Sequence, residues 1–175
     1  MLNNHPNTLS SGAPLAGVIA GQGVSISGST VTAVGGYNVA GTASGTVYTL
    51  TASSAAVTFG TTQPSATLAQ AGTYLLIGRA YLIYNAATFA GTQTATLKLR
   101  RTNNTAADVT GATTTATLRI ITTTTDTVGI MTMPAVIYTT TNTDDAVAVF
   151  GALSATPSVG SVDVNEASVL AIRLY

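Results

Sequence analysis

From residue 37 to the C-terminus, the sequence is a succession of short runs in which small polar and branched apolar residues alternate between turn residues. Alternation with a period of two puts successive side chains on opposite faces of a strand, and no helical repeat competes with it. The pattern predicts an all-β domain of nine strands, at the spacing of a sandwich or barrel. The expected strands are 46–52, 55–60, 73–84, 94–101, 115–122, 127–133, 135–140, 146–153 and 167–175.

The longest of these runs, residues 72–84, is apolar on both faces apart from Arg79. A strand of this kind is covered on both sides, so we expect it at the centre of a sheet. One face should meet the core and the other a neighbouring subunit. The final run, residues 167–175, has the same character with Arg173 as its only charge, so the C-terminal segment should belong to the folded sheet.

Charged residues are scarce in this chain. Only 7% of the residues are Asp, Glu, Lys or Arg, whereas a typical soluble domain has about 25%. Hydrophobic residues make up 46%, yet no run approaches the roughly 18 apolar residues of a spanning helix. A membrane barrel would have aromatic girdles, but Trp is absent, so no membrane insertion is expected. A chain with so few charges has little polar surface, so we expect other subunits to cover part of that surface, most simply in a homo-oligomer.

The remaining composition excludes several classes of partner. The net charge is +0, so no basic patch predicts nucleic-acid binding. There is no cysteine and therefore no disulfide framework. The N-terminus lacks the positive charge that opens a secretory signal, and secretion by that route is not expected.

Three segments are predicted along the chain. Residues 1–22 cannot form a core of their own, and they are interpreted as an anchoring arm, with a frayed terminus as the alternative. The pattern at residues 23–36 predicts a β-hairpin with strands at 24–27 and 30–34, which we call the neck. Residues 37–175 are expected to form the main β domain, which we call the head. The anchoring candidates in the arm are Leu9, Pro14, Leu15, Val18 and Ile19.

Threonine is concentrated at 113–115, 122–125 and 139–141. A glycosylation-prone tract is one interpretation of such stretches. We favour strands in which β-branched Thr lines a wet or weakly packed face.

The inventory of reactive side chains does not predict an enzyme. The chain has one histidine and six carboxylates, and His5 lies in the arm. Residues 144–145 are interpreted as a turn before a strand, with a calcium site as the alternative, and residues 163–166 as a loop before the last strand. No Gly-x-Ser-x-Gly motif precedes a histidine. No catalytic residue, metal site or cofactor is expected.

The glycine-bounded motif GQGVSISGSTVTA at 21–33 resembles the β-motif that precedes the distal domain of tailed-phage fibre and head-decoration proteins. Residues 68–80, 97–101, 145–149 and 168–175 are similar to strands of the jelly-roll head of phage fibres, whose layout is like that of the tumour necrosis factor and complement globular heads. The resemblance implies a homotrimer about a three-fold axis. Each protomer would be a two-sheet antiparallel jelly-roll sandwich with one sheet turned inward.

Trimer-interface candidates come from the aromatic and arginine residues of the expected strands. Such heads place more aromatic residues near the axis than this chain offers, so its packing is expected to rely on aliphatic residues and threonine as well. An arginine in these strands needs a carboxylate or carbonyl partner wherever it is buried. The candidates are Tyr74, Arg79, Tyr81, Tyr138, Arg173 and Tyr175.

The expected function is that of a non-enzymatic virion structural protein, a capsid decoration, cement or head-fibre protein. The resemblance implies that the arm binds the major capsid protein or another virion protein, at the virion surface, after synthesis in the host cytoplasm. One alternative is the receptor-binding tip of a tail fibre, and a host-surface glycan stays open as a further partner. A carbohydrate-binding module is the last alternative.

Overall fold

The computed structural model of the chain describes residues 24–27, 30–33, 37–38, 47–88, 91–103, 106–118 and 127–174. These segments contain strands and no helix, and so none of them holds a helix that could cross a membrane. The strands are β1 (Val24–Ser27), β2 (Thr30–Ala33), β3 (Tyr37–Asn38), β4 (Tyr48–Thr49), β5 (Ala55–Ala56), β6 (Ser65–Leu68), β7 (Gly72–Thr88), β8 (Gln93–Arg101), β9 (Asp108–Leu118), β10 (Thr127–Thr132), β11 (Val136–Thr140), β12 (Asp145–Leu153) and β13 (Val159–Arg173).

The first large sheet is built around the two longest strands, β7 and β13. They pair antiparallel, from Val159 opposite Thr88 to Arg173 opposite Tyr74. The other edge of β7 pairs with β10 and β11, and the other edge of β13 pairs with β3 and β4. The prediction that the long apolar run forms a central strand is confirmed.

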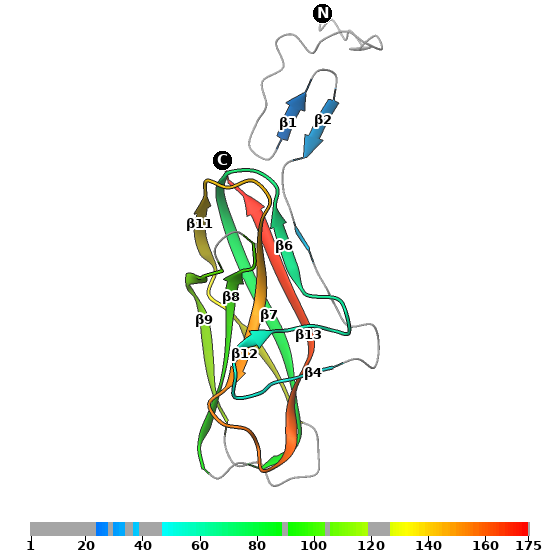
Figure 1. Cartoon of the computed structure of the whole chain (residues 1–175), viewed down its shortest axis with the longest axis vertical. Helices are drawn as coiled ribbons and strands as arrows, with labels where there is room; N and C mark the ends of the chain where they lie inside the picture. The colour runs from blue at the N-terminus through cyan, green and yellow to red at the C-terminus, as the bar shows by residue number, and fades with distance from the viewer. Residues whose placement is uncertain are drawn as a thin grey trace, which may run out of the picture.

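The second large sheet has the order β5–β12–β8–β9, with β6 also paired to β12. Along the chain, β7 lies in the first sheet, β8 and β9 in the second, β10 and β11 in the first, β12 in the second and β13 in the first. All pairs are antiparallel, and the winding between two sheets is that of a jelly-roll sandwich (Figure 1). This is the fold class that the sequence predicted.

The core lies between the two sheets and is filled mainly by leucine, valine and alanine. Leu76 and Leu82 enter it from β7, while Leu97, Leu99 and Val149 enter it from β8 and β12, and all five are fully buried. Each of these strands turns alternate side chains inward, so the alternation in the sequence directly determines which residues form the core.

Two glycines allow the sheets to approach each other closely. A Cβ atom at Gly78 of β7 would lie 2.6 Å from Met133 Cε and 2.8 Å from Leu99 Cδ2. A Cβ atom at Gly151 of β12 would lie 2.5 Å from Leu50 Cδ2. Glycine therefore occupies the points at which facing side chains leave no room for a methyl group.

The last strand begins earlier than predicted. The sequence analysis placed its start at residue 167 and treated 163–166 as a loop, but β13 starts at Val159. Val162 and Val164 are fully buried, and Asp163 between them is accommodated by neutral hydrogen-bond donors. The loop interpretation is wrong because a strand with a bulge between Val164 and Glu166 holds these polar residues in the sheet.

Other strands also differ from the prediction: β3 was not predicted, β4 and β5 are shorter than expected, and β7 is longer. β9 begins at Asp108 rather than at residue 115. The charged Asp108 fits into a strand because its carboxylate lies on the outer surface, where it pairs with Lys98 Nζ at 2.8 Å. β6 was not predicted at all, although Ala66 and Leu68 alternate into the core in the expected way. Of its four residues only Thr67 is of a type enriched in strands, so the run did not stand out from a loop in the sequence.

Near the N-terminus, β1 and β2 pair antiparallel with Val24 opposite Ala33, which is the predicted hairpin. The arm at 1–22 lies outside the described residues, as do its anchoring candidates and Tyr175. The division into arm, neck and head stays a prediction.

Candidate functional site

The outer face of the first sheet is the most unusual surface of the described molecule. On β7, Leu76 and Leu82 point into the core, whereas the alternate residues Leu75, Ile77 and Tyr81 point away from it and are half-buried. An antiparallel sheet with one solvated face normally carries polar residues there. Here the outward positions of the central strand from Leu75 to Ile83 are apolar as well, apart from Arg79.

Cross-strand pairing extends these positions into apolar rows. Ile137 of β11 and Ile172 of β13 flank Leu75 on either side, and both are largely exposed, at 63% and 42%. In the next row, Ile77 lies opposite Leu170. Directly opposed residues of an antiparallel pair present their side chains on the same face, so these five side chains form one continuous surface.

Further along the sheet, the rows combine apolar and charged residues. Arg79 lies opposite Ser168, and in the following row Tyr81 lies between Ile130 of β10 and Glu166 of β13. Ile130 is 69% exposed, the highest exposure among the large hydrophobic residues that the structure describes. We call the whole surface the isoleucine face. Its apolar members are Leu75, Ile77, Tyr81, Ile130, Ile137, Leu170 and Ile172.

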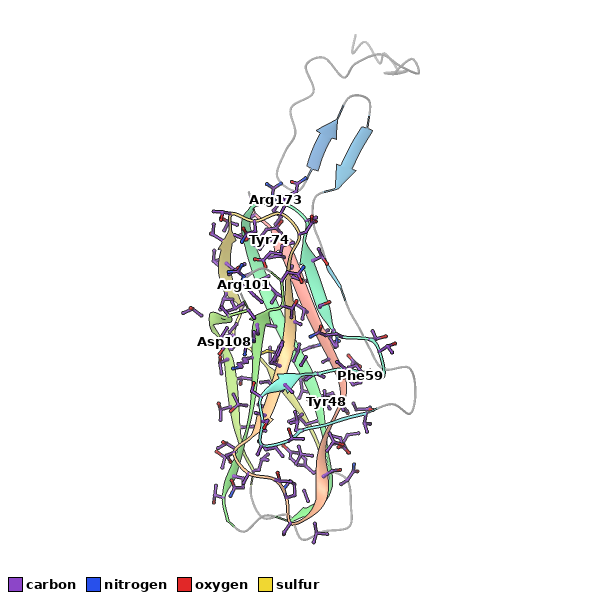
Figure 2. All side chains as sticks on the ribbon, viewed as in Figure 1. Tyr48, Phe59, Tyr74, Arg101, Asp108 and Arg173 are labelled. Atoms are coloured by element: carbon purple, nitrogen blue, oxygen red, sulfur yellow. The ribbon has the colours of Figure 1, made fainter. Side chains whose placement is uncertain are left out.

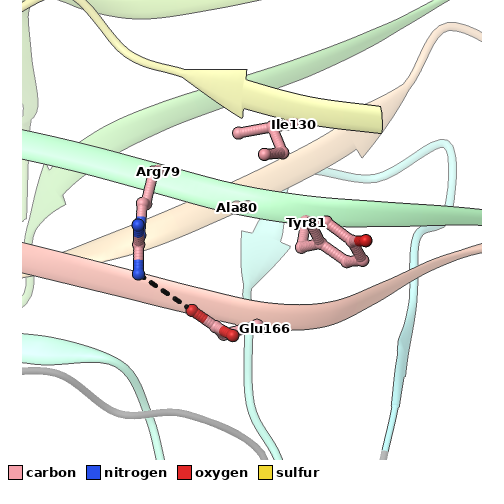
Figure 3. A pocket seen from close by; sticks show the side chains of 5 residues that line it. All are labelled: Arg79, Ala80, Tyr81, Ile130 and Glu166. Atoms are coloured by element: carbon pink, nitrogen blue, oxygen red, sulfur yellow. Dashed lines mark hydrogen bonds and ion pairs between the residues drawn. The ribbon is translucent and has the colours of Figure 1, made fainter. Parts of the chain in front are cut away.

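One ion pair lies within the isoleucine face. Arg79 Nη2 donates to Glu166 Oε1 at 3.1 Å, and Arg79 Nε donates to Ser168 Oγ at 3.1 Å. A shallow pocket adjoins the pair and is lined by Arg79, Ala80, Tyr81, Ile130 and Glu166 (Figure 3). The face therefore offers a cation, an anion and an apolar recess side by side.

The outer face of the second sheet has a different character. Thr94 and Thr96 of β8 lie opposite Thr117 and Thr115 of β9, and the next pair is Lys98 opposite Thr113. We call this surface the threonine face; it comprises these six residues together with Arg100, Asp108 and Phe150 of the same sheet.

The charged groups of the threonine face are paired within the chain. Lys98 Nζ lies 2.8 Å from Asp108 Oδ2, and the Arg100 guanidinium lies 5.4 Å from the centroid of the Phe150 ring. Water can satisfy the threonine hydroxyls. This face needs no partner to be stable in solvent.

The structure separates the predicted interface residues onto two sides of the sheet. Arg79 and Tyr81 lie on the isoleucine face. Tyr74 lies on the opposite side, in the core with 2% exposure, and its hydroxyl donates to the carbonyl of Gln70 at 2.7 Å. Its ring therefore stabilises the protomer and cannot contribute the surface contact for which it was selected.

Tyr138 and Arg173 also point to the interior side. Figure 2 shows Arg173 and Tyr74 near the same end of the sandwich. Arg173 Nη1 donates to Gln70 Oε1 at 2.6 Å and Nη2 to the Ala71 carbonyl at 3.0 Å, which is the kind of partner expected for a partly buried arginine. Tyr138 packs against the core. Of the described candidates, the structure brings only Arg79 and Tyr81 together on one exposed surface.

Asp145 forms a buried polar cluster that joins the two sheets. Its carboxylate has no exposure and accepts hydrogen bonds from Tyr138 Oη at 2.9 Å and Thr140 Oγ1 at 3.0 Å, both in β11. Arg101 Nε of β8 lies 3.1 Å from Asp145 Oδ2. Burial raises the pKa of the Tyr138 hydroxyl above its usual value, and the hydrogen bond to Asp145 raises it further. The cluster is a structural cross-link between β11 and the second sheet.

A second buried carboxylate, Asp163, is surrounded by neutral groups. It accepts hydrogen bonds from Thr49 Oγ1 at 2.7 Å, from Ser161 Oγ at 2.9 Å and from the Asn85 side-chain amide. No group of three or more His, Asp or Glu side chains with a metal-site arrangement occurs in the described ranges. The donors around Asp145 and Asp163 explain their burial without any ligand.

The sequence analysis missed the residues that dominate the isoleucine face. Ile130, Ile137 and Ile172 were included in expected strands, but aromatic and arginine residues were preferred as interface candidates. The missed signal is parity: in each strand these isoleucines occupy the positions that alternate with core residues such as Met131 and Ala171. The expectation that the trimer's packing relies on aliphatic residues and threonine stays a prediction.

The sequence matches no protein-family model and no curated protein. Among solved structures, the chain is similar to the Eiger TNF from S. frugiperda, with a TM-score of 0.38 and 12% sequence identity. The similarity covers 63% of this chain and 64% of the Eiger chain, so it spans less than two thirds of either. The jelly-roll assignment accordingly rests on the strand order of the molecule itself.

Proposed function

We propose that this chain is a non-enzymatic structural protein that assembles as a homotrimer through its isoleucine face and forms a decoration, cement or head-fibre element on the surface of a phage virion. The observation that supports it most is the exposure of Ile130, Ile137 and Ile172 on one sheet face, in a chain with only 7% charged residues.

An exposed apolar sheet face is unfavourable in water. Burying one isoleucine side chain contributes roughly 1.5–3 kcal/mol, and each protomer offers three that are more than 40% exposed. Large contiguous apolar patches on a soluble protein usually mark an interaction site. The self-association of identical chains covers the same face on every copy, which makes it the simplest occupant.

Three-fold symmetry and the virion setting are supported by the sequence resemblance. The motif at 21–33 and the strands of the head resemble parts of tailed-phage fibre and decoration proteins. In that arrangement, the isoleucine faces of three protomers meet around the axis, the threonine faces point outward, and residues 1–22 attach the trimer to the capsid.

The virion role is tested on particles of the virus whose genome encodes this chain. Mass spectrometry of purified particles should find the full chain, and deletion of residues 1–22 should remove it from the particles while leaving the trimer intact. A sharper version uses Leu15→Asp with Ile19→Asp, and as matched control Ser10→Asp with Ser11→Asp. Absence of the full chain from particles would refute the virion role. Equal incorporation of the deletion would refute anchoring by the arm.

A further inference from the structure

The Arg79–Glu166 ion pair occupies a central place on the isoleucine face. Arg79 is on β7 and Glu166 is on β13, which are the two central strands of the first sheet. Apolar residues lie on both sides along the strands: Ile77 and Leu170 form the row before the pair, and Ile83 follows it on β7. Any partner that covers this face must also cover the two charges.

Both charged groups have unused hydrogen-bonding capacity. The side chains of Arg79 and Glu166 are 57% and 45% exposed. Two N–H groups of Arg79 are engaged, by Ser168 and Glu166, and within the described ranges the other three have no protein acceptor. In the same ranges, Glu166 accepts a hydrogen bond from Arg79 alone. Solvent must satisfy the rest in the free protomer.

Covering the face removes that solvent. A buried charge is tolerated when it gains further hydrogen bonds from its new surroundings, and it is strongly unfavourable when it does not. A purely apolar partner would leave three arginine N–H groups and most of the carboxylate without partners. A second copy of this chain brings the complementary pair, an arginine and a glutamate at the same level of the face.

The pocket next to the pair supplies the space for such a contact. It measures about 200 Å³, and Tyr81 and Ile130 form its apolar wall while the two charged side chains form most of the remainder (Figure 3). A guanidinium with its aliphatic stem matches this combination, since the stem can lie along the apolar wall while the head group reaches the carboxylate.

We infer that Arg79 of each protomer binds Glu166 of the next protomer, so that the trimer contains a closed ring of alternating arginine and glutamate side chains at its axis. This inference rests on the proposed function. The ring fixes the height and the rotation at which the isoleucine faces meet. Apolar contacts alone specify register weakly, whereas paired charges specify it strongly.

The test uses charge reversal and subunit mixing. Arg79→Glu alone makes every site of the ring acidic, and Glu166→Arg alone makes every site basic. Each variant should raise the dissociation constant of the trimer by about 30-fold or more, as measured by sedimentation velocity. In a mixed trimer two of the three contacts join opposite charges and the third joins like charges, so an equimolar mixture should assemble more tightly than either variant alone and less tightly than wild type. Native mass spectrometry should find trimers that contain both chains. The double variant Arg79→Glu with Glu166→Arg should form homotrimers.

Lys98→Glu and Asp108→Arg are the matched controls, because they reverse the charges of an intrachain pair on the threonine face. They should leave the trimer unchanged. If wild-type chain is trimeric and Arg79→Glu and Glu166→Arg remain trimeric with unchanged affinity, the ring is refuted while the proposed trimer stands. A monomeric wild-type chain would refute both.

A second readout does not depend on how well the charge-reversed chains fold. The chain contains no cysteine, so Arg79→Cys and Glu166→Cys introduce single thiols. A mixture of these two variants, oxidised under mild conditions, should form disulfide-linked dimers that contain one chain of each kind. A mixture of Lys98→Cys and Asp108→Cys should not. No excess of linked dimers over that control would overturn the inference.

Discussion

The two sheets of this sandwich carry opposite kinds of outer surface. On the threonine face, rows of threonine hydroxyl groups lie next to charges that are paired within the chain, as in Lys98 with Asp108. On the isoleucine face, cross-strand rows place Ile137, Leu75 and Ile172 side by side in the open. Both faces are built on equally regular antiparallel strands. Because the strand geometry is alike on both sheets, the fold does not require both outer faces to be exposed to water.

The scarcity of charge has different meanings on the two faces. Threonine on the outer positions of β9 keeps strand propensity and hydration without adding charge. Apart from Arg79, Glu166 and Ser168, the isoleucine face has apolar residues at positions where a solvated sheet face normally has polar ones. Low charge is therefore a property of both faces, but only the isoleucine face combines it with exposed isoleucine side chains, which is the basis of the proposed self-association.

The largest effect is expected from placing a charge on the isoleucine face. Ile137→Lys removes roughly 1.5–3 kcal/mol of burial from each protomer and brings an unpaired ammonium group into the interface, which is more unfavourable still. The variant should be monomeric by sedimentation velocity. Thr115→Lys on the threonine face is the matched control and should stay trimeric; dissociation of both variants, or of neither, would remove the contrast between the faces.

The next effect compares a buried carboxylate with an exposed one. Asp145→Ala leaves Arg101, Tyr138 and Thr140 without their acceptor and should lower the free energy of unfolding by about 3–5 kcal/mol. Asp108→Ala on the threonine face should lower it by about 0–1 kcal/mol. Urea denaturation measures both variants. Equal losses would show that the cluster between the sheets is no stronger than a surface ion pair.

A smaller effect is expected at the close approach of the sheets. The methyl group of Gly78→Ala would meet Met133 and Leu99, so this variant should lose about 1–3 kcal/mol of unfolding free energy. Gly129→Ala in β10 is the control, because the nearest atom to its Cβ is 4.0 Å away, and it should be close to neutral. Thermal unfolding measures the loss of stability in both variants. An unfolding free energy of Gly78→Ala equal to that of wild type would mean that the core repacks freely at this position.

The smallest effect concerns alkaline pH. The pKa of Tyr138 is raised above 10.0 in the folded chain, mainly by burial, so the unfolded chain loses this proton first as the pH rises. The stabilisation from the protonated hydroxyl is complete below pH 10.0 and is lost as the pH rises through the folded pKa. The unfolding free energy of Tyr138→Phe should therefore fall less steeply above pH 10 than that of wild type, with other tyrosines common to both. Parallel pH profiles would contradict this.

Period-two alternation was sufficient to predict an all-β sandwich or barrel and the central position of β7, because the core depends on parity more than on residue identity. The jelly-roll layout was predicted only through the family resemblance. It failed where a strand contains buried polar residues, as at Asp163 in β13, since the donors that accommodate this carboxylate come from Thr49 and Asn85, far away in sequence. β6 escaped detection because only Thr67 among its four residues is of a type enriched in strands.

For the candidate site, the sequence indicated Arg79 and Tyr81 but also Tyr74, which is one position out of phase with the exposed face. Parity separates Tyr74 from Leu75, yet a run that is apolar on both faces gives no internal sign of which side is the core. Glu166 was not linked to Arg79 because the register of β13 against β7 includes a bulge. A bulge shifts which residues meet, and the sequence pattern alone does not locate it.

The central claim, that copies of this chain cover the isoleucine face, is tested most directly by the mass of the wild-type chain in solution at micromolar concentration. Multi-angle light scattering on the chromatography peak should give three times the chain mass of 17.5 kDa. A stable monomer of 17.5 kDa would contradict the account, because it would leave Ile130, Ile137 and Ile172 exposed to water with no copy of the chain to cover them.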